Sequence, residues 1–598
     1  MSWAYTPPVD DILFYLEHCT GLFGDEAEGR IDRDLAHAIL TEAGRYAAEV
    51  LVPLNASLDR NGARHDGNGV ITGPGHKAAF DKFVEDGWVG LNLSEEWGGQ
   101  GLPSALYAAA LEFWHTGSLG FAMGNLLTVG AAETIEAHGS EALKQSYLPR
   151  LASGEWTATM ALTEPAAGSD LGVVKVKATP LEDGSYAVSG TKIFISYGDH
   201  DLTGNIVHLV LARLPDAPEG SRGLSLFLVP KSVPENSGLT PNNVKCVGIE
   251  KKVGLHASPT CVMRFGEGGD SRGWLIGQPH RGLMAMFTMM NNARMAVATQ
   301  GVGASEWAYQ KSLEFAKERK QGKGTGPLAE SERGIIAHPD VQNMLLTMRA
   351  LACAGRCIIL ELGNAIDQAG KGDSSAQARA DLLTPIAKAF CTDSGIQSGC
   401  LGIQVHGGMG VVEETGIAQV WRDARVTTIH EGTNGIQALD FVGRKLAILP
   451  EEEVQGLIRG YWDVAKGLIQ SENDAVARAG RQLTDAVAAL ERSQIKIAEY
   501  RLANRGLASQ AVATAALRQF SLVAGCAYLG KATLAATGQT APHHRRFRTD
   551  LCFFANDLLS EVFGLERVIA EGEGILANLD ENLLLDPGVA TDRVASLL

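Results

Sequence analysis

The pattern of hydrophobic and polar positions divides the chain into a helical, a β-rich and a second helical region. Apolar residues recur with the spacing of one helix face from about Asp10 to Gly154, for example at Leu40, Ala43 and Ala47. A Gly-rich segment, SEEWGGQGLPS, interrupts this pattern and is expected to be a loop. The first region is therefore predicted to be mainly α-helical.

From Trp156 to about Phe265 the pattern changes to short strands bounded by turn residues. No long helix is indicated between these strands, which favours an antiparallel sheet over a Rossmann fold. The predicted strands are Thr157–Thr163, Tyr186–Ser196, Ile206–Leu211, Leu224–Val229 and Thr260–Phe265.

Helical spacing returns after Pro279 and is interrupted by a turn-rich stretch, Gly407–Gly435. A last helical region is expected after Leu449-Pro450, because Glu451–Glu453 would place negative charge in a first helical turn, where the helix dipole favours it. The short basic run HHRRFR, His543–Arg548, is interpreted as a solvated loop. The long helices predicted in between are Arg294–Lys320, Pro339–Gly370 and Ala376–Val405.

Charge and composition exclude several classes of protein. The 598 residues include 52 basic and 69 acidic side chains, a net charge of −17, which disfavours binding to nucleic acid or anionic lipid by the bulk surface. No apolar stretch approaches the roughly 20 residues that span a bilayer. The beginning of the chain, MSWAYTPPVDD, lacks the features of a secretory signal or transit peptide. A cytoplasmic location without a membrane span is therefore expected.

Nine scattered cysteines argue for reduced thiols. None forms a CxxC pair, so neither a disulfide framework nor a zinc or other metal site is expected. Cys353 and Cys357 are four residues apart and should lie on one buried helix face.

Two segments of the β-rich region suggest a cofactor site. MALTEPAAGSDLG, Met160–Gly172, runs from a strand into a turn of small residues that would let backbone N–H groups and a hydroxyl approach a pyrophosphate. In GTKIFIS, strand alternation places Ile193 and Ile195 on one face and Phe194 and Ser196 on the other. An aromatic ring beside a hydroxyl suits a flat heteroaromatic group. Taken alone, the first segment is equally compatible with an ordinary structural turn, and the second is better explained as a half-buried strand with a core Phe.

The third informative segment is QVHGGMGVVEETGIAQVWRDARVTTIHEGTNGIQ, Gln404–Gln437. Its glycines permit close backbone approach, and Arg422 and Asp423 can pair. Glu431 precedes Gly432 and another helical run; burial in such a setting would raise its pKa and suit a general base. The alternative for a single carboxylate here is a residue that merely starts a helix.

Together the three segments resemble the acyl-CoA dehydrogenase family, over roughly Ser94 to Lys445. TEPAAGSD resembles the family's TEPxAGSD flavin loop, KIFIS its K-x-[WF]-I-[TS] strand, IHEGTNGIQ its catalytic segment and QVHGGMG its Q-x-x-G-G-x-G segment. ERKQG matches E-R-x-x-F-G less well, because Gln321 and Gly322 replace the aromatic position, and Pro339 stands where many members have Gln. The length and the N-terminal YTPPVDDILF also resemble the large bacterial branch that includes 3-methylthiopropionyl-CoA dehydrogenases.

The resemblance implies an α+β multidomain fold with an N-terminal helical domain, a central antiparallel β-domain, a C-terminal four-helix bundle and an extra C-terminal helical domain. The corresponding divisions are a helical extension at 1–35, an N-terminal α-domain at 36–155, the β-domain at 156–278, the bundle at 279–449 and the extra domain at 450–598. Members of this size usually form homodimers.

The resemblance also implies an FAD-dependent oxidoreductase that converts an acyl-CoA to a trans-2-enoyl-CoA and passes electrons to electron-transfer flavoprotein. Glu431 would remove the α-proton, and its backbone N–H together with a ribityl hydroxyl of FAD would polarise the thioester. Ser169, Asn291 and Arg294 would lie on the acyl-CoA side. The residues expected at FAD are Met160, Leu162, Thr163, Gly168, Ser169, Phe194, Ser196 and Thr433, with Arg319, Gln404 and Gly408 reaching the ADP part across a dimer interface.

Other functions fit less well. Medium-chain, long-chain and aromatic-terminated acyl groups stay open beside 3-methylthiopropionyl-CoA, as does an acyl-CoA oxidase that reduces O₂. Damage-response flavoproteins of this fold that bind nucleic acid are disfavoured by the net charge and by Glu431. Gly269–Gly273 fits the pattern G-x-S-x-G but lacks a following helix and a triad order, so we expect a loop.

Overall fold

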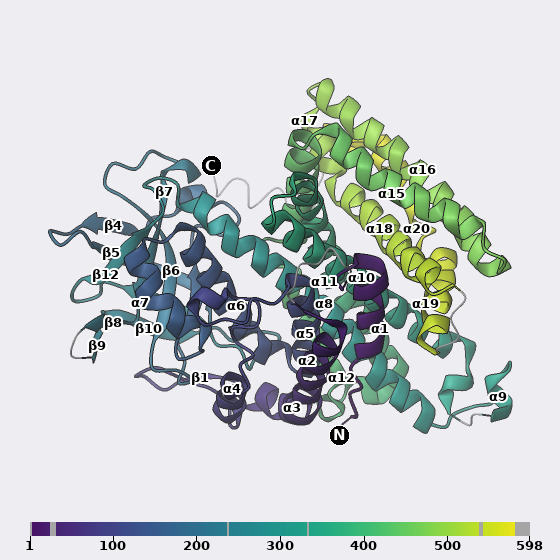
Figure 1. The fold of residues 1–598 in the computed structure, drawn as a ribbon, viewed down its shortest axis with the longest axis horizontal. Helices are drawn as coiled ribbons and strands as arrows, with labels where there is room; N and C mark the ends of the chain where they lie inside the picture. The colour runs from purple at the N-terminus through teal and green to yellow at the C-terminus, as the bar shows by residue number, and fades with distance from the viewer. Residues whose placement is uncertain (1–2, 24–30, 236–237, 332–333, 538–541, 580–598) are drawn as a thin grey trace, which may run out of the picture.

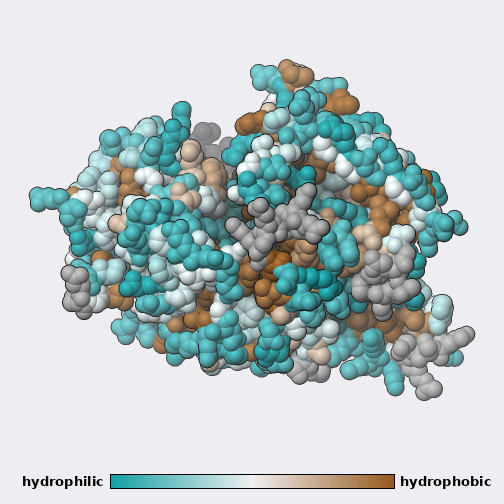
Figure 2. All heavy atoms as spheres, in the orientation of Figure 1, coloured by the Kyte–Doolittle hydropathy of each residue, from teal (hydrophilic) through white to brown (hydrophobic). Residues whose placement is uncertain are grey.

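The protein consists of a strand-rich part on one side and helical parts around it, as Figure 1 shows for the computed structural model. The structure describes residues 3–23, 31–235, 238–331, 334–537 and 542–579. The face shown in Figure 2 is mainly hydrophilic, with hydrophobic patches scattered over it. Within the described ranges, no helix is both long and apolar enough to cross a bilayer.

The first helical part is built around two buried helices. In α5 and α6, apolar residues occupy nearly the whole circumference, and such helices fold only where other elements cover every side. The Asp32 side chain starts α2 by accepting a hydrogen bond from Leu35 N at 2.7 Å. The elements are α1 (Val9–Tyr15), α2 (Arg33–Tyr46), α3 (Val52–Asn61), β1 (Arg64–His65), β2 (Val70–Ile71), α4 (His76–Glu85), α5 (Ser104–Gly117), α6 (Leu119–His138) and α7 (Glu141–Ala152).

The strand-rich part is an eight-stranded sheet in the order β10-β11-β5-β12-β7-β6-β3, with β4 pairing with both β5 and β6. Because β4 bridges these two strands, the sheet closes on itself around a separate core that includes Val188, Val210, Phe227 and Met263. The strands are β3 (Thr157–Ala161), β4 (Lys177–Pro180), β5 (Tyr186–Ser196), β6 (Ile206–Arg213), β7 (Leu224–Pro230), β10 (Val244–Ile249), β11 (Thr260–Phe265) and β12 (Ser271–Ile276), beside the hairpin β8 (Ser232–Glu235) and β9 (Gly238–Pro241).

All five predicted strands are present, but the sheet is not wholly antiparallel. β3 pairs with β6 in parallel, and a single parallel bridge, Lys177 to Arg213, joins β4 to β6. The loop predicted at Gly269–Gly273 is wrong in part, because Ser271 begins β12. Ser271 Oγ accepts a hydrogen bond from Gly266 N and donates one to Asn243 O, both at 2.9 Å. This hydroxyl therefore joins the start of β12 to the end of β11 and the start of β10.

The third part is a bundle of long helices. α8 and α11 pack so closely that a Cβ atom at Gly301 would lie 2.1 Å from Cys391 O, so only glycine fits there. The predicted turn-rich stretch Gly407–Gly435 was wrong in one respect, since it contains a complete helix, α12. The helices are α8 (Gly282–Glu318), α9 (Leu328–Ser331), α10 (Pro339–Gly370), α11 (Ser374–His406), α12 (Ile417–Thr427), α13 (Asn434–Asp440) and α14 (Leu446–Ile448).

The predicted additional helical region after Pro450 is confirmed, and it packs on the bundle. Its central helix α18 contacts α10, α11 and α13, and Phe520 lies edge-on to Phe441 with ring centroids 5.2 Å apart. The loop predicted at His543–Arg548 is wrong, because this run lies in α19, where Arg546 pairs with Asp11 at 2.8 Å. The helices are α15 (Glu451–Ile469), α16 (Asp474–Leu502), α17 (Gly506–Ala511), α18 (Ala513–Ala535), α19 (Pro542–Phe553) and α20 (Glu561–Glu571).

All nine cysteines are free. Cys353 and Cys357 are both buried on α10, as their spacing predicted. Among the described residues, no group of three or more His, Cys, Asp or Glu side chains could hold a metal ion.

Candidate functional site

Glu431 lies in a tight turn between α12 and α13. Its φ is +56°, a left-handed conformation that is strained for a residue with a side chain. Asn434 N donates to Thr428 O at 3.0 Å and closes the turn, and Thr433 Oγ1 accepts from Ile436 N at 3.2 Å as the N-cap of α13. Gln437 Nε2 lies 3.4 Å from Glu431 O. The turn is therefore held by hydrogen bonds from both of its sides.

The surroundings of Glu431 suit a base that works near neutral pH. Burial raises its pKa to about 7, and the positive charges of Arg294 and Lys388 oppose this rise. Burial lowers the pKa of the neighbouring His430 to about 3, so this imidazole is neutral and adds no charge. Among ordinary side chains, a carboxyl with this pKa is a good proton acceptor at pH 7.

Arg294 brings a buried positive charge to the turn. It lies on α8 with 7% of its surface exposed, and its Nη2 is 4.0 Å from where a Cβ atom would stand at Gly432. Its Nη1 donates to Asn291 Oδ1 at 3.2 Å, while its Nε has no partner in the described part of the chain. The structure therefore brings Asn291, Arg294 and Glu431 into one region.

A buried ion pair shapes the predicted flavin loop. Lys192 Nζ lies 2.8 Å from Glu164 Oε1 and donates to Leu162 O at 2.8 Å. The Glu164 carboxylate also accepts from Lys175 N at 2.7 Å and Val176 N at 3.0 Å. These bonds fix both ends of the loop, so that its tip, with Ser169, faces solvent.

The end of β5 beside this loop is irregular and exposed. Phe194 has φ +58° and is 57% exposed, and the pairing of β5 with β11 shifts register next to it. This bulge interrupts the regular strand alternation that the sequence predicted. Ile193 N donates to Thr163 O at 2.9 Å and joins the strand end to the loop. The Phe194 ring therefore lies outside the core, where it could cover the face of a bound ring.

The residues in this region fit a flavin with a diphosphate tail. The hydroxyls of Thr163, Ser169 and Ser196 have no hydrogen-bond partner among the described residues. Nothing lies within 4 Å of a Cβ atom built at Gly168, so the loop tip leaves open space. Free hydroxyls, an exposed ring and an open glycine turn together match the donor set that an isoalloxazine and a pyrophosphate require. Of the other residues predicted here, Met160 is buried on β3 and Leu162 is half-buried.

Three predicted residues lie elsewhere. Arg319, Gln404 and Gly408 are exposed at the far ends of α8 and α11, where the Phe315 and His406 rings stack at 4.2 Å. Arg319 is separated from Arg294 by 25 residues of a continuous helix, a distance of about 37 Å. Arg319 therefore lies far along α8 from Arg294 and the Glu431 turn.

An open groove adjoins the flavin loop. Its volume is about 1180 Å³, and it is lined by Asp170, Lys175, Lys177 and the segment 213–221. Arg213 shapes one wall, because its guanidinium donates to Val174 O at 2.7 Å and to Pro218 O at 3.0 Å. The groove therefore begins at Asp170, next to Ser169, and its lining includes Lys175 and Lys177 together with Glu219.

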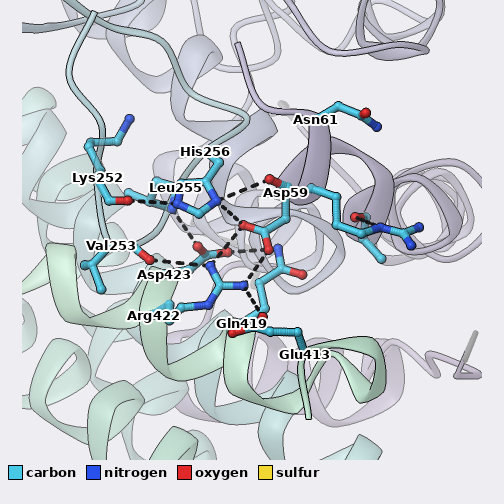
Figure 3. Close-up of polar contacts among 12 residues, drawn as sticks. Asp59, Asn61, Lys252, Val253, Leu255, His256, Glu413, Gln419, Arg422 and Asp423 are labelled. Carbon is cyan, nitrogen blue, oxygen red and sulfur yellow. Dashed lines mark hydrogen bonds and ion pairs between the residues drawn. The ribbon is translucent and has the colours of Figure 1, made fainter. Parts of the chain in front are cut away.

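A polar junction of three elements supports α12 (Figure 3). The Asp59 carboxylate on α3 accepts from both Arg422 Nη1, at 3.1 Å, and Nη2, at 2.5 Å. His256 Nδ1 lies 2.8 Å from Asp59 Oδ1, and His256 Nε2 lies 2.8 Å from Lys252 O. The expected pairing of Arg422 with Asp423 is wrong, since the buried Asp423 accepts from Leu255 N at 2.6 Å.

This junction fixes the helix that leads to the Glu431 turn. A Cβ atom at Gly254 would lie 2.3 Å from Arg422 O, so the loop crosses α12 at a point where only glycine fits. Burial and the nearby Asp59 raise the pKa of Asp423 to about 6. A cavity of about 580 Å³ beside the junction is lined by Arg60, Lys251 and other residues, none of them predicted for the site.

The junction predicts a pH-dependent stability. Both nitrogens of His256 face acceptors, so the imidazole donates twice only when protonated, and Asp59 raises its pKa above the ordinary value of 6.5. The stabilisation is then full below pH 6.5 and is lost as pH rises through the folded-state pKa. We expect His256→Gln to lower the urea midpoint of unfolding more at pH 6 than at pH 9. An equal loss at both pH values would contradict this; the exposed His37→Gln is the control.

The roles of some residues of the site could not be predicted from sequence periodicity alone. Lys192 stands within the GTKIFIS segment, and Glu164 within TEPAAGSD, but their pairing needs the fold. Lys388 interrupts an apolar helix in the sequence PIAKAF, which is an unusual place for a lysine and could have been noticed. The support of the turn by Asn434 and Gln437 depends on side-chain geometry that no spacing predicts.

Comparison with known families gives matches along most of the chain. The profile described as acyl-CoA dehydrogenase, N-terminal domain, matches residues 34–155. The middle-domain profile of the same family matches 159–267, and the C-terminal-domain profile matches 280–446. The match to the last profile contains the Glu431 turn.

Individual proteins agree with these profiles. The chain is 46% identical over 452 residues to 3-methylmercaptopropionyl-CoA dehydrogenase of Ruegeria pomeroyi, covering 74% of this chain and 76% of that protein. It is 35% identical to a butyryl-CoA dehydrogenase of Syntrophomonas wolfei over 510 residues, 82% of this chain and 83% of the other. An acyl-CoA dehydrogenase of Bacillus anthracis, solved with FAD, has the same fold with a TM-score of 0.71 and 22% identity, covering 92% of this chain and 89% of that one.

Proposed function

The chain belongs to the acyl-CoA dehydrogenase family, and from this premise we propose that it oxidises a short acyl-CoA, with 3-methylmercaptopropionyl-CoA as the first candidate, using Glu431 as the base. The family acts on the CH–CH bond next to a thioester and uses FAD. The observation that carries the proposal is the position of Glu431, on a left-handed turn beside the buried Arg294 and within the matched C-terminal domain, where a pKa of about 7 suits proton abstraction at neutral pH.

The reaction removes two hydrogens from adjacent carbons. The Glu431 carboxylate takes the α-proton, and its backbone N–H, held in place by the left-handed turn, donates to the thioester oxygen as negative charge develops there. FAD, when bound, accepts the β-hydrogen together with the electron pair of the broken C–H bond. The two carbon atoms then share a trans double bond, and Glu431 carries the proton that it has taken.

The other predicted residues are proposed to hold the two ligands. Thr163, Ser169 and Ser196 would supply hydroxyl groups to FAD, with Phe194 beside its ring, because these groups are otherwise unpartnered or exposed. Arg294 and Asn291 would lie on the acyl-CoA side. The groove beside Ser169 would take the phosphate-bearing end of coenzyme A, because Lys175 and Lys177 line it.

Arg319, Gln404 and Gly408 are proposed to contact the ADP part of FAD in a second copy of the chain. Arg319 lies about 37 Å along α8 from Arg294, beside the Glu431 turn of its own chain, so the FAD that it contacts is proposed to have its flavin ring in the other copy. A homodimer follows from this proposal. Electron-transfer flavoprotein is the proposed acceptor of the electrons.

The substrate is tested with the purified protein loaded with FAD. Under anaerobic conditions, 3-methylmercaptopropionyl-CoA is expected to bleach the visible flavin absorbance, and to do so faster than butyryl-, octanoyl- or palmitoyl-CoA. Faster bleaching by octanoyl- or palmitoyl-CoA would contradict the short acyl group. Rapid consumption of O₂ with release of peroxide would contradict electron-transfer flavoprotein as the acceptor and identify an oxidase.

A further inference from the structure

Lys388 is a buried lysine without an ionic partner in contact. It lies on α11 with no exposed surface, and its Nζ makes one hydrogen bond within the described part of the chain, to Asn434 Oδ1 at 2.8 Å. The other fully buried lysine, Lys192, differs because it pairs directly with Glu164. A lysine is almost never buried without such a pair, since the loss of its hydration is costly. Lys388 therefore calls for a role beyond packing.

Asn434 connects Lys388 to the catalytic turn. It is the first residue of α13, and its backbone N–H donates to Thr428 O, which closes the turn that carries Glu431. Its side-chain amide donates to Thr392 Oγ1 at 3.1 Å and to Asp393 Oδ1 at 2.8 Å. One amide group thus ties the turn to three residues of α11, namely Lys388, Thr392 and Asp393.

Lys388 and Glu431 interact electrostatically. The positive charge of Lys388 lowers the pKa of Glu431, and burial lowers the pKa of Lys388 itself to about 7. The groups that act on this pair are Arg294 from α8, Asp393 from α11, His430 from the turn, Asp440 and Arg444 through Arg294, and His115 on α5 through His430.

We propose that Lys388 is a positioning residue for the reaction: through Asn434 it fixes the turn that carries Glu431, and its positive charge keeps Glu431 as the carboxylate that takes the proton. This rests on the proposed role of Glu431 as the base. Lys388 contacts neither substrate nor cofactor in this account. It acts only through Asn434 and through its charge.

The extra C-terminal helices pack against the two helices that carry Lys388 and Asn434. α18 packs on both α11 and α13, and Arg518 on α18 lies over the Phe390 ring at 5.9 Å, two residues along α11 from Lys388. Arg518 is itself held by Glu561 of α20 at 3.0 Å. The elements that carry Lys388 and Asn434 are therefore clamped between the bundle and the extra helices.

The test uses Lys388→Met, which keeps the length of the side chain but removes its charge and its hydrogen bonds. Flavin reduction by the substrate that works best with the unaltered enzyme is measured from pH 5.5 to 9. Because the active form of the base is the carboxylate, the acidic limb of the rate profile is expected to move up by about one pH unit. At pH 7 the rate is expected to fall about fivefold, with little change in KM.

Three companion variants separate position from charge. Asn434→Ala keeps the lysine and is expected to lower the rate across the pH range without moving the acidic limb to the same extent. Lys388→Arg keeps the charge and is expected to restore the limb. Lys445→Met is the control. Lys445 lies outside α11 and pairs with Asp381 of α11 at 2.6 Å, so its removal should leave the pH profile unchanged.

The proposal is overturned if Lys388→Met and Asn434→Ala, both with a full complement of FAD, reproduce the rates and the pH profile of the unaltered enzyme. If Lys388→Met does not fold, an unchanged rate in Asn434→Ala is sufficient to overturn it. Failure of the unaltered enzyme to reduce its flavin with any acyl-CoA would instead refute the proposed function.

Discussion

Glu431→Gln is expected to abolish turnover while FAD stays bound. The amide keeps the size of the side chain but cannot accept the α-proton, and loss of a general base costs about 10²–10⁴ in rate. The flavin should therefore keep its oxidised spectrum after anaerobic addition of a substrate that bleaches the unaltered enzyme. In the unaltered enzyme, the rate should rise with pH through about 7, because burial sets the pKa of Glu431 there and the carboxylate is the active form.

The control for this variant is Glu133→Gln. Burial raises the pKa of Glu133 to about 7 as well, but this carboxyl lies on α6 and accepts from Asn92 Nδ2 at 3.1 Å, and the groups that act on its pKa, Asn292, Asn92 and Glu136, are not part of the Glu431 turn. We expect Glu133→Gln to react at close to the normal rate. If Glu431→Gln still bleaches normally, or if both variants lose activity equally, the assignment of the base to Glu431 is wrong.

The parts of the fold that the sequence predicted are those with a strong local signal. Helix α10 was predicted with both of its ends, since Pro339 can start a helix and apolar residues continue to its last turns. β5 and β11 were predicted with the same precision, because β-branched and aromatic residues are frequent in both segments and turn residues flank them. Helix α12 was missed, because the glycines on both sides of it indicated turns and its short length gave little periodicity.

The sequence could not predict what depends on long-range contact. The parallel pairing of β3 with β6, the Asp59–His256–Arg422 junction and the anchor at Lys388 each join segments far apart in the chain. The motif at Glu431 was sufficient to propose its chemistry. Its left-handed backbone and the side chains that support it required the structure. The division of the chain into five parts by residue number stays a prediction.

Arg356→Met is expected to cost more stability than any other single change discussed here. Arg356 on α10 donates to both oxygens of Glu112 on α5 at 3.0 Å and to Glu306 on α8 at 2.8 Å, and all three side chains are buried. Removing the guanidinium leaves two buried carboxylates facing each other without a counter-charge. Breaking a buried ion pair in this way costs about 3–5 kcal/mol. The measurement is the urea midpoint of unfolding.

The pH dependence of the stability lost in Arg356→Met distinguishes the effect of unpaired buried carboxylates from the effect of lost side-chain packing. Burial already raises the pKa of Glu112 in the presence of Arg356, and without the arginine this carboxyl should bind a proton at still higher pH. Arg356→Met should therefore lose less stability at pH 5, where protonation removes the repulsion, than at pH 8. Arg492→Met, which breaks an exposed pair with Glu566, should cost under about 1 kcal/mol at either pH. A loss in Arg356→Met that is independent of pH would mean that the arginine supports these helices by its volume and not by its charge.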